Sequence, residues 1–589
     1  MKDINEEIIR LQDKIAKLPS GYISKKTIYG KTRQYYQWME DGKKKSKYVD
    51  EETSKKLNEG ILLRRSLQKE LKELKMKTVN KDNNEESYHS IVLTGLRLKD
   101  FVRLADTYKR RPLIEKIVEY LNSDVNKVLI LYGLRRTGKT TLIQQSIASF
   151  SEEDFDKTAF IQIKYDDNLS LLNKDLKKLQ SLGYKYIFID EVTLMEDFIE
   201  GAALFSDIYV TSGMRIILSG TDSLGFLFSE DEQLYDRCIM LHTTFISYKE
   251  FSDVLGIEGI DEYIKYGGTM SLSGVNYNKN STFANIKSTD EYIDSAIARN
   301  IQHSLKYYQY AGHFRSLEDL YNNNELTSAI NRVVEDINHR FTIEVLTNDF
   351  VSHDLGLSAK NLRNNKSNPN DILDNIDKEA FTRGLKESLE IKNKVEQTVK
   401  IEDIHRLEIK QYLDLLDLTV DILVESLPVS NKKEYMTVIS QPGLRYSQAD
   451  ALIKQLLLDE KFKDISVIER KRIIERIQDE IKGRMMEEIV LLETKKALAD
   501  KQVFKLKFAV GEFDMVVCDS GSLTCQIYEI KHSDKAVKNQ YRHLIDENKC
   551  AEFEFRFGKI TNKIVIYRGE SKYDGEIEYK NVEEYLRSL

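Results

Sequence analysis

The sequence predicts a multidomain α/β protein: a small basic β-ribbon module, a parallel-sheet core, a helical region and a second α/β domain. Its 589 residues exceed what one hydrophobic core usually serves. A short apolar run is followed by a glycine-rich loop and a helical pattern at 128–150, which is the order of a strand, loop and helix. After about residue 476, helical patterns give way to short runs rich in Val, Ile and Phe.

Composition excludes several classes of protein. No stretch approaches the roughly 18 consecutive apolar residues of a membrane span, and the first residues have no apolar signal region. The four cysteines form no C-x-x-C pair, which argues against a zinc ribbon or a disulfide scaffold, and we expect Cys518, Cys525 and Cys550 to be small buried apolar residues. We therefore expect a cytoplasmic protein without a membrane partner.

The first 80 residues form a basic module, with 20 Lys/Arg against 12 Asp/Glu in a chain of net charge −7. Residues 20–50 alternate turn signals with runs of Tyr, Ile and Trp, which predicts a three-stranded meander. Its aromatic residues and interleaved lysines would suit contact with nucleic acid, but they also fit a tiny sheet with an aromatic core and solvated edges. The flanks, 3–18 and 51–77, predict two helices that could pair, and 78–90 reads as a linker.

A nucleoside-triphosphate site is predicted at 128–150. The run VLILY (128–132) precedes GLRRTGKT (133–140), which fits G-x-x-x-x-G-K-[ST] at every specified position. In such a loop backbone N–H groups surround the phosphates, the lysine reaches the β- and γ-phosphates, and the threonine hydroxyl binds Mg²⁺. The candidate ligands are Gly133, Arg136, Thr137, Gly138, Lys139, Thr140 and Thr141.

Carboxylates follow a second buried strand at 186–190. Asp190 would hold Mg²⁺, and Glu191 would act as the base that polarises the attacking water. A further strand at 215–218 ends in polar residues, of which Ser219 is our first candidate for a γ-phosphate contact and Thr221 the alternative. Arg237 could reach a nucleotide in its own chain or in a neighbouring subunit, or it could simply pair with a surface carboxylate.

The phrases GLRRTGKTTL, YIFIDE, IILSGTDS and DRCIMLHTTFISYKEF together resemble prokaryotic AAA+ ATPases of the archaeal-ATPase type. The resemblance is specific over residues 92–252. It implies an AAA+ core that uses ATP and Mg²⁺, with the P-loop and Asp190 on different, non-adjacent strands. It also implies a C-terminal restriction-endonuclease-like domain, which such chains commonly carry.

Residues 253–475 show helical patterns with polar breaks, and we expect an ATPase lid and an adaptor, such as a winged helix, in this region. The histidines here have no metal-ligand spacing, so we expect them to be solvated or core residues.

Residues 476–589 carry a candidate nuclease site. Asp514, followed fifteen residues later by Glu529-x-Lys531, has the spacing of the PD-(D/E)XK core, and a strand period of two places Glu529 and Lys531 on one face. Asp514 and Glu529 would hold Mg²⁺, Lys531 would orient or activate a water, and Glu487 on an upstream helix could add a fourth carboxyl group. Chance also produces this spacing, and a degenerate nuclease fold or an unrelated α/β domain would fit too.

Together these observations predict an ATP-hydrolysing protein with a Mg²⁺-dependent nuclease domain that acts on nucleic acid, with DNA as the expected substrate and a homo-oligomer as a possible assembly. By resemblance, such an arrangement suits defence against foreign DNA or the biology of mobile elements. The main alternative is a signalling or scaffold ATPase, in which the nucleotide switches assembly and the C-terminal domain binds nucleic acid without cutting it.

Overall fold

The computed structural model describes residues 88–221, 234–270, 285–298, 314–323, 325–345, 401–428, 433–456 and 466–589, with shorter stretches of residues 14–67 and a few single residues elsewhere. The chain forms two compact units, 1–88 and 89–589. Within the described residues, no helix has the length and apolar character needed to cross a bilayer.

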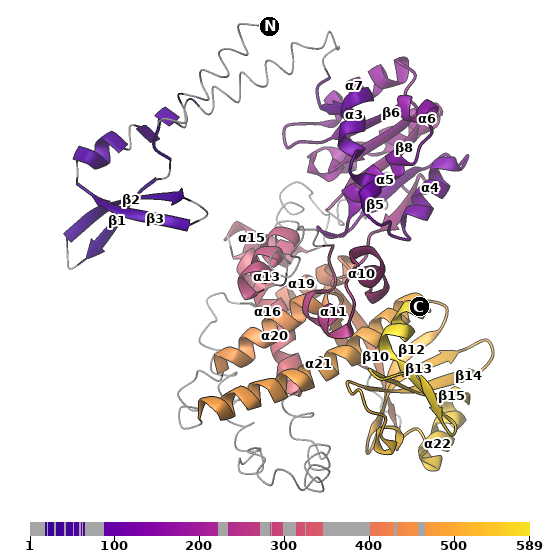
Figure 1. Ribbon diagram of the computed structural model, residues 1–589. Helices are drawn as coiled ribbons and strands as arrows, with labels where there is room; N and C mark the ends of the chain where they lie inside the picture. The colour runs from indigo at the N-terminus through magenta and orange to yellow at the C-terminus, as the bar shows by residue number, and fades with distance from the viewer. Residues whose placement is uncertain are drawn as a thin grey trace. The chain divides into compact units, whose positions relative to one another are not determined.

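The N-terminal unit contains a three-stranded antiparallel sheet in the order β1-β2-β3. The strands are β1 (Tyr22–Ile28), β2 (Lys31–Glu40) and β3 (Lys43–Val49). The predicted three-stranded meander is thus confirmed (Figure 1). Most of the two flanking helices predicted at 3–18 and 51–77 lies outside the described residues, although 52–57 are helical.

The second unit begins with a six-stranded sheet in the order β4-β6-β7-β8-β5-β9, which is parallel except for the edge strand β4. Its strand β8 lies between β5 and β7, so the strands that end in the P-loop and in Asp190 are not adjacent, as the resemblance implies. The strands are β4 (Ile91–Leu93), β5 (Val128–Tyr132), β6 (Thr158–Gln162), β7 (Tyr186–Asp190), β8 (Arg215–Gly220) and β9 (Cys238–His242).

Helices cover this sheet, and their apolar faces form its core with the buried strands (Figure 1). The helix after the P-loop, α5 (Lys139–Ala148), packs against α3 (Gly95–Val102), α4 (Ile114–Asn122) and β8. The other helices of this part are α6 (Glu152–Asp156), α7 (Leu169–Ser181), α8 (Phe198–Gly201) and α10 (Tyr248–Leu255). Because β5, β7 and β8 are almost entirely buried, the residues that follow them are held at one firm edge.

The described residues between 253 and 475 are mainly helical. The helices are α11 (Ile260–Tyr266), α13 (Ile286–Ile293), α15 (Arg315–Asn322), α16 (Leu326–Glu344), α19 (Asp403–Leu415) and α20 (Pro442–Leu456). Two strands in this region, β10 (Thr419–Leu427) and β11 (Glu434–Ile439), join the C-terminal sheet, so they are not the wing of a separate winged helix. The predicted boundary at 475/476 is also wrong, because it falls inside α21 (Val467–Ala497).

The C-terminal sheet has eight strands in the order β11-β10-β12-β13-β14-β15-β17-β16. Its centre is the antiparallel set β12, β13 and β14, and β15 continues parallel to β14. Its remaining elements are β12 (Gln502–Phe508), β13 (Glu512–Asp519), β14 (Thr524–Lys531), α22 (Glu547–Phe557), β15 (Lys559–Tyr567), β16 (Lys572–Asp574), β17 (Ile577–Asn581) and α23 (Val582–Ser588).

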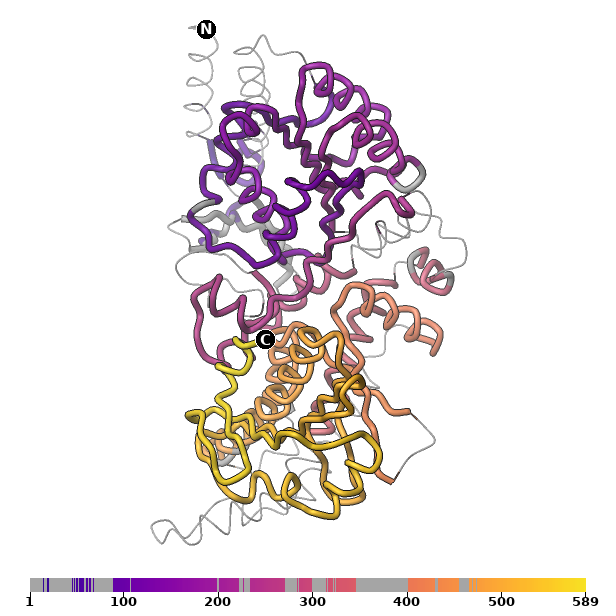
Figure 2. Tube along the Cα trace, turned by 90° about the vertical axis from the view of Figure 1, so that its right-hand side faces the viewer, coloured from indigo at the N-terminus to yellow at the C-terminus, as the bar shows by residue number. Residues whose placement is uncertain are grey.

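The long helix α21 packs against β10, β12 and β14 of this sheet (Figure 1), and Figure 2 shows the same segment beside the yellow strands. Its buried residues include Met485, Met486, Ile489 and Val490, which share a core with strand residues such as Met515. Glu487 follows Met486 on this helix, and its side chain reaches the sheet, where Oε2 lies 3.5 Å from Lys505 Nζ of β12.

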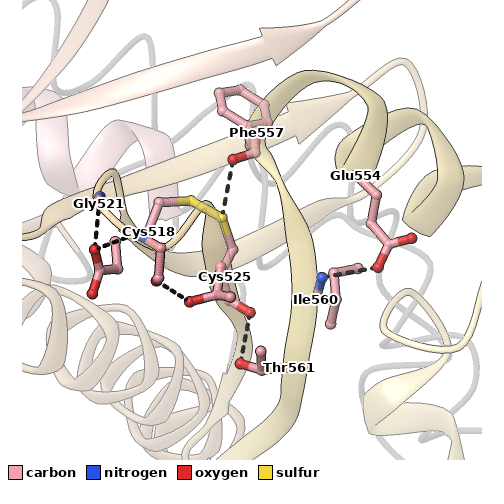
Figure 3. The surroundings of a disulfide bond; sticks show 10 residues. Cys518, Gly521, Cys525, Glu554, Phe557, Ile560 and Thr561 are labelled. Carbon is pink, nitrogen blue, oxygen red and sulfur yellow. Dashed lines mark hydrogen bonds between the residues drawn. A yellow bond between two sulfur atoms is a disulfide. The ribbon is translucent and has the colours of Figure 1, made fainter.

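Cys518 and Cys525 form a disulfide across the β13–β14 pair, where they stand directly opposite each other (Figure 3). The expectation that both are merely small apolar residues is therefore corrected, although both are buried. The seven-residue separation across a tight strand connection escaped a search for C-x-x-C pairs, because only the strand register brings the two side chains together.

Candidate functional site

The P-loop adopts a conformation that its glycines permit. Gly138 has φ of 86° and Gly133 φ of 143°, and a Cβ on Gly133 would lie 2.5 Å from Thr243 Oγ1. Lys139 begins α5 and donates hydrogen bonds of 2.8 Å to the carbonyl oxygens of Gly133 and Leu134. The loop is therefore folded around the lysine ammonium group, which occupies the concave side of the loop.

Burial gives Lys139 an unusual electrostatic state. Its side chain is almost fully buried, and this desolvation lowers its pKa to about 8, although the carboxylates of Glu191 and Asp190 oppose the shift. A buried ammonium group that is held only by carbonyl oxygens and distant carboxylates can gain much from a closer anion. The loop thus offers a cation and the N-terminus of α5 to a phosphate group.

Three polar residues from three elements meet at the edge of the sheet. Thr140 Oγ1 donates a 2.9 Å hydrogen bond to Asp190 Oδ2, and Ser219 Oγ donates to Asp190 Oδ1. Asp190 and Ser219 are both buried, at the ends of β7 and β8. The predicted Mg²⁺ ligands Thr140 and Asp190 are thus in direct contact. Ser219 contacts Asp190, and the alternative residue, Thr221, contacts Glu191.

Glu191 follows β7 in a left-handed conformation, with φ of 57°. Its backbone N–H donates to Asp190 Oδ1 at 3.0 Å, and Thr221 Oγ1 donates to Glu191 Oε2 at 3.3 Å. Burial and the neighbouring Asp190 charge raise the pKa of Glu191, which makes its carboxylate a stronger base. Such backbone strain is concentrated at functional sites.

The remaining predicted P-loop residues have separate surroundings. Thr137 Oγ1 donates to Leu134 O at 2.8 Å and lies 2.8 Å from Thr243 Oγ1. The Arg136 guanidinium lies 5.7 Å from the centre of the Tyr292 ring. Thr141 lines a cavity of about 150 Å³ beside the start of α5. The other residues that line it are Thr107, Tyr108, Lys109, Arg111, Gly138, Leu142, Gln145, Val254 and Met270.

Arg111 is a site residue that the sequence analysis missed. It is 4% exposed and forms two hydrogen bonds to the Glu250 carboxylate, of 2.7 and 2.9 Å. It also donates a 2.6 Å hydrogen bond to the carbonyl oxygen of Thr137 in the P-loop. Because 139 residues separate Arg111 from Glu250, no local spacing could have revealed the pair.

Arg237 does not lie beside the P-loop. It precedes β9, and its carbonyl accepts a hydrogen bond from Val128 at the start of β5, whereas the P-loop follows the other end of β5. Its guanidinium pairs with Asp207 at 2.9 Å. The expectation of a nucleotide contact within the same chain is therefore corrected, and a contact with a second copy remains a prediction.

A second cluster of charged residues lies on the C-terminal sheet. Asp514 on β13 accepts hydrogen bonds at one oxygen, Oδ2, from Ile530 N at 2.8 Å and from Lys531 Nζ at 3.0 Å. Lys531 Nζ also lies 2.8 Å from Glu529 Oε2. Asp514 and Glu529 are 2% and 3% exposed, and Glu529 Oε1 is buried without a hydrogen-bond partner. The structure thus brings the three predicted residues together.

Glu487 reaches the same place from α21. Carboxylate oxygens of Glu487, Glu512 and Asp514 lie within 4.8 Å of one another. Lys505 Nζ on β12 lies between them, 2.7 Å from Glu512 and 3.5 Å from Glu487. Sequence analysis missed Glu512 and Lys505, although Glu512 stands two residues before Asp514 and so shares its face of the strand.

Opposed effects set the protonation of these groups. Burial would raise the pKa of Asp514, but Lys531, Lys505 and the Ile530 N–H outweigh it and hold the pKa at about 2. Burial and the Asp514 charge raise the pKa of Glu487 to about 7. Burial also raises the pKa of Glu529, against the attraction of Lys531. The cluster therefore holds more carboxyl groups than it can keep ionised without further positive charge.

Helix α21 also contacts the first sheet's helices. Glu493 is buried, and its Oε1 accepts a 2.8 Å hydrogen bond from the backbone N–H of Tyr248 at the start of α10. Burial raises the pKa of Glu493 to about 8. Since α10 carries Glu250, the partner of Arg111, packed elements connect the P-loop with the helix that carries Glu487.

Residues 125–252 match the family described as AAA domain. This part of the chain is similar to AAA domains. The matched residues include the P-loop with Lys139 and the strand that ends at Asp190. Residues 1–59 match a domain of unknown function.

The matching proteins are distant. An uncharacterised protein of Methanocaldococcus jannaschii is 25% identical in a match 225 residues long, which covers 33% of this chain and about half, 48%, of that relative. The DNA-bound Orc1 protein of Aeropyrum pernix is 12% identical with a TM-score of 0.21, over 59% of this chain and 94% of Orc1. The Hsp104–ADP complex of S. cerevisiae is 12% identical with a TM-score of 0.24, over 66% of this chain and 50% of the Hsp104 chain. These TM-scores are too low to support an argument about this chain.

Proposed function

We propose that this protein is an ATPase whose C-terminal domain is a Mg²⁺-dependent nuclease that acts on DNA. The observation that carries the nuclease proposal is the convergence of Glu487, Asp514, Glu529 and Lys531, from one helix and two strands, into one largely buried cluster. The contact of Thr140 and Ser219 with Asp190 supports the ATPase half.

In the ATPase site, Lys139 would leave its two carbonyl partners and pair with phosphate oxygens. Thr140 and Asp190 fit a Mg²⁺ ion, since a hydroxyl and a carboxylate oxygen already lie 2.9 Å apart, and oxygen atoms are the ligands that Mg²⁺ prefers. When bound, the ion would neutralise phosphate charge. Ser219 holds the Asp190 carboxylate in place from the other side.

Glu191 would accept the proton of the attacking water. Its raised pKa favours proton uptake, and its hydrogen bond from Thr221 directs the second carboxylate oxygen. Thr221 follows Ser219 and Gly220 at the end of β8. The end of this strand therefore carries both Ser219, the candidate for a γ-phosphate contact, and Thr221, which hydrogen-bonds the base Glu191.

In the nuclease site, Asp514 and Glu529 fit a divalent cation. The buried, unpartnered Oε1 of Glu529 is an oxygen that lacks a ligand, and hard carboxylate oxygens suit Mg²⁺. When bound, the ion would polarise the phosphodiester and acidify a water. Lys531 is 34% exposed at the edge of the cluster, where its ammonium group can orient that water or the phosphate.

The test is cleavage of plasmid and single-stranded DNA by the full chain with Mg²⁺, with and without ATP. We expect cleavage by the wild type and its loss in Asp514→Asn and in Lys531→Ala. Asp519→Asn is the matched control, because Asp519 lies on the same strand but caps the exposed turn at Gly521. Equal cleavage by Asp514→Asn and Asp519→Asn would refute the assignment.

The scaffold alternative predicts a different result. A wild type that hydrolyses ATP, binds DNA and never cuts it would establish that reading, and cleavage of RNA alone would change the substrate. The basic module contributes separately: if residues 1–77 contact phosphates, their deletion should weaken DNA binding and flatten its salt dependence. Unchanged binding would favour a purely structural sheet.

A further inference from the structure

The charge of Lys505 is out of reach of solvent. The side chain is 2% exposed, and its ammonium group lies 2.7 Å from Glu512 Oε1 and 3.5 Å from Glu487 Oε2. It makes ion pairs but no hydrogen bond with good donor geometry. The ammonium group therefore acts here mainly as a buried positive charge set among carboxylates.

The surroundings of this charge have the composition of a metal site. Oxygens of Glu487, Glu512 and Asp514 lie within 4.8 Å of one another, so a single cation could touch all three. Without a cation, three carboxylates at this spacing would repel one another strongly in a buried environment. Lys505 supplies positive charge to Glu487 and Glu512, Arg484 Nη1 lies 2.9 Å from Glu487 Oε2, and Lys531 pairs with Asp514. Of these three cations, Lys505 is the one that is almost fully buried.

Lys531 and Lys505 pair with different carboxylates of the cluster, and their side chains differ in exposure. Lys531 pairs with Asp514 and Glu529 but is 34% exposed, so it can swing toward solvent when a cation arrives. Lys505 pairs with Glu487 and Glu512 and is 2% exposed, so it has no such exit. The ammonium group of Lys531 can thus leave Asp514 and Glu529, whereas the ammonium group of Lys505 cannot leave Glu487 and Glu512.

We infer that Lys505 is a built-in cation that permanently fills a second metal position, so that this site takes one divalent cation and not two. The inference rests on the proposed nuclease function and deepens it. The ion at Asp514 and Glu529 would then be supported by a fixed ammonium charge instead of a second ion. Glu512 and Glu487 would hold that charge and would not be ligands of the exchangeable ion.

The experiment counts bound Mn²⁺ in the full chain without nucleotide, by titration calorimetry and by the electron paramagnetic resonance of free Mn²⁺. Lys505→Met removes the ammonium group and keeps an unbranched side chain of the length of the lysine stem. We expect it to bind one more Mn²⁺ than the wild type, and Lys505→Met/Glu512→Gln to lose that extra ion. Lys507→Met is the matched control, because Lys507 lies on the same strand but is 49% exposed, and it should leave the count unchanged.

Glu512→Gln in the wild-type background keeps the inference testable if Lys505→Met does not fold without a cation. It should not change the number of Mn²⁺ ions, because Lys505 and not an ion occupies that position. A count that falls by one in Glu512→Gln, or an unchanged count in folded Lys505→Met, would overturn the inference. Recovery of folded Lys505→Met on addition of Mn²⁺ would support it.

These outcomes are separate from those of the nuclease assay. A wild type that cuts DNA but binds an additional ion through Glu512 refutes only the role of Lys505. A wild type that cuts nothing refutes the nuclease proposal, while the change in Mn²⁺ count between wild type and Lys505→Met still tests how the cluster is filled.

Discussion

Replacement of Arg111 by methionine should destabilise the fold around the P-loop and weaken nucleotide binding. Arg111 forms two hydrogen bonds to Glu250 and one to the Thr137 carbonyl, all in a region where both charged side chains are largely buried. Arg111→Met leaves the Glu250 carboxylate buried without its cation and a P-loop carbonyl without its donor.

The magnitude follows from the cost of an uncompensated buried charge. Breaking a buried pair from one side costs about 3–5 kcal/mol, whereas replacing both partners by apolar residues costs much less. At roughly 2–4 °C per kcal/mol for a domain of this size, Arg111→Met should lower the unfolding temperature by about 10 °C. The double variant Arg111→Met/Glu250→Met should recover a large part of that loss.

The assay is thermal unfolding of the full chain, with and without ATP and Mg²⁺, followed by a double-mutant cycle. Because the Thr137 carbonyl loses its donor in both variants, ATP-dependent stabilisation should stay reduced even where the apo-protein recovers. Additive effects of the two single substitutions would refute the reasoning, since independent residues add and coupled ones do not. So would a loss below about 0.5 kcal/mol for Arg111→Met, which is the size of an ordinary surface change.

Three further outcomes are expected. Phosphate oxygens would raise the pKa of Lys139 from about 8, so ATP affinity should fall above pH 8, by up to about tenfold per pH unit. In equilibrium binding measurements, Lys139→Arg should flatten this dependence on pH. A wild-type affinity that does not change with pH would contradict the buried state of the lysine. Glu191→Gln should still bind ATP but lose turnover by roughly 100-fold or more in a phosphate-release assay, and retained turnover would exclude it as the base. Burial raises the pKa of Glu493 from 4.5 to about 8 in the folded state, so its contribution to stability is full below pH 4.5 and is lost as the pH rises toward 8. When the free energy of unfolding is measured from pH 5 to 9, Glu493→Gln should remove up to about 1.4 kcal/mol per pH unit of this dependence. Parallel pH profiles of the wild type and the variant would be evidence against this protonation.

Local sequence order predicted the strand, loop and helix of the P-loop, because a P-loop is built from neighbours in the chain. The strand at 128–132, the loop and α5 follow one another directly, so Lys139 and Thr140 could be located without tertiary information. The strands ending at Asp190 and Ser219 were also visible as apolar runs with polar ends. The strand period likewise predicted that Glu529 and Lys531 share one face.

The boundaries of the C-terminal domain could not be predicted in the same way. Strands β10 and β11 lie among helices in the sequence, and only their pairing with β12 assigns them to the C-terminal sheet. The direct register of Cys518 and Cys525 is equally a property of the β13–β14 pair. The residues of one strand do not show which other strand it will pair with, so this pairing could not be predicted from the sequence.

By itself, the sequence determined which chemistry is available: a phosphate-binding loop, paired acidic residues after a buried strand, and an acidic–basic alternation on a later strand. Tertiary structure decided which charges meet. Arg111 with Glu250, and Lys505 with Glu487 and Glu512, come from segments far apart in the chain, and Arg237 is separated from the P-loop by the length of β5. The physical reason is that local motifs depend on backbone conformation over a few residues, whereas buried ion pairs depend on the packing of whole elements.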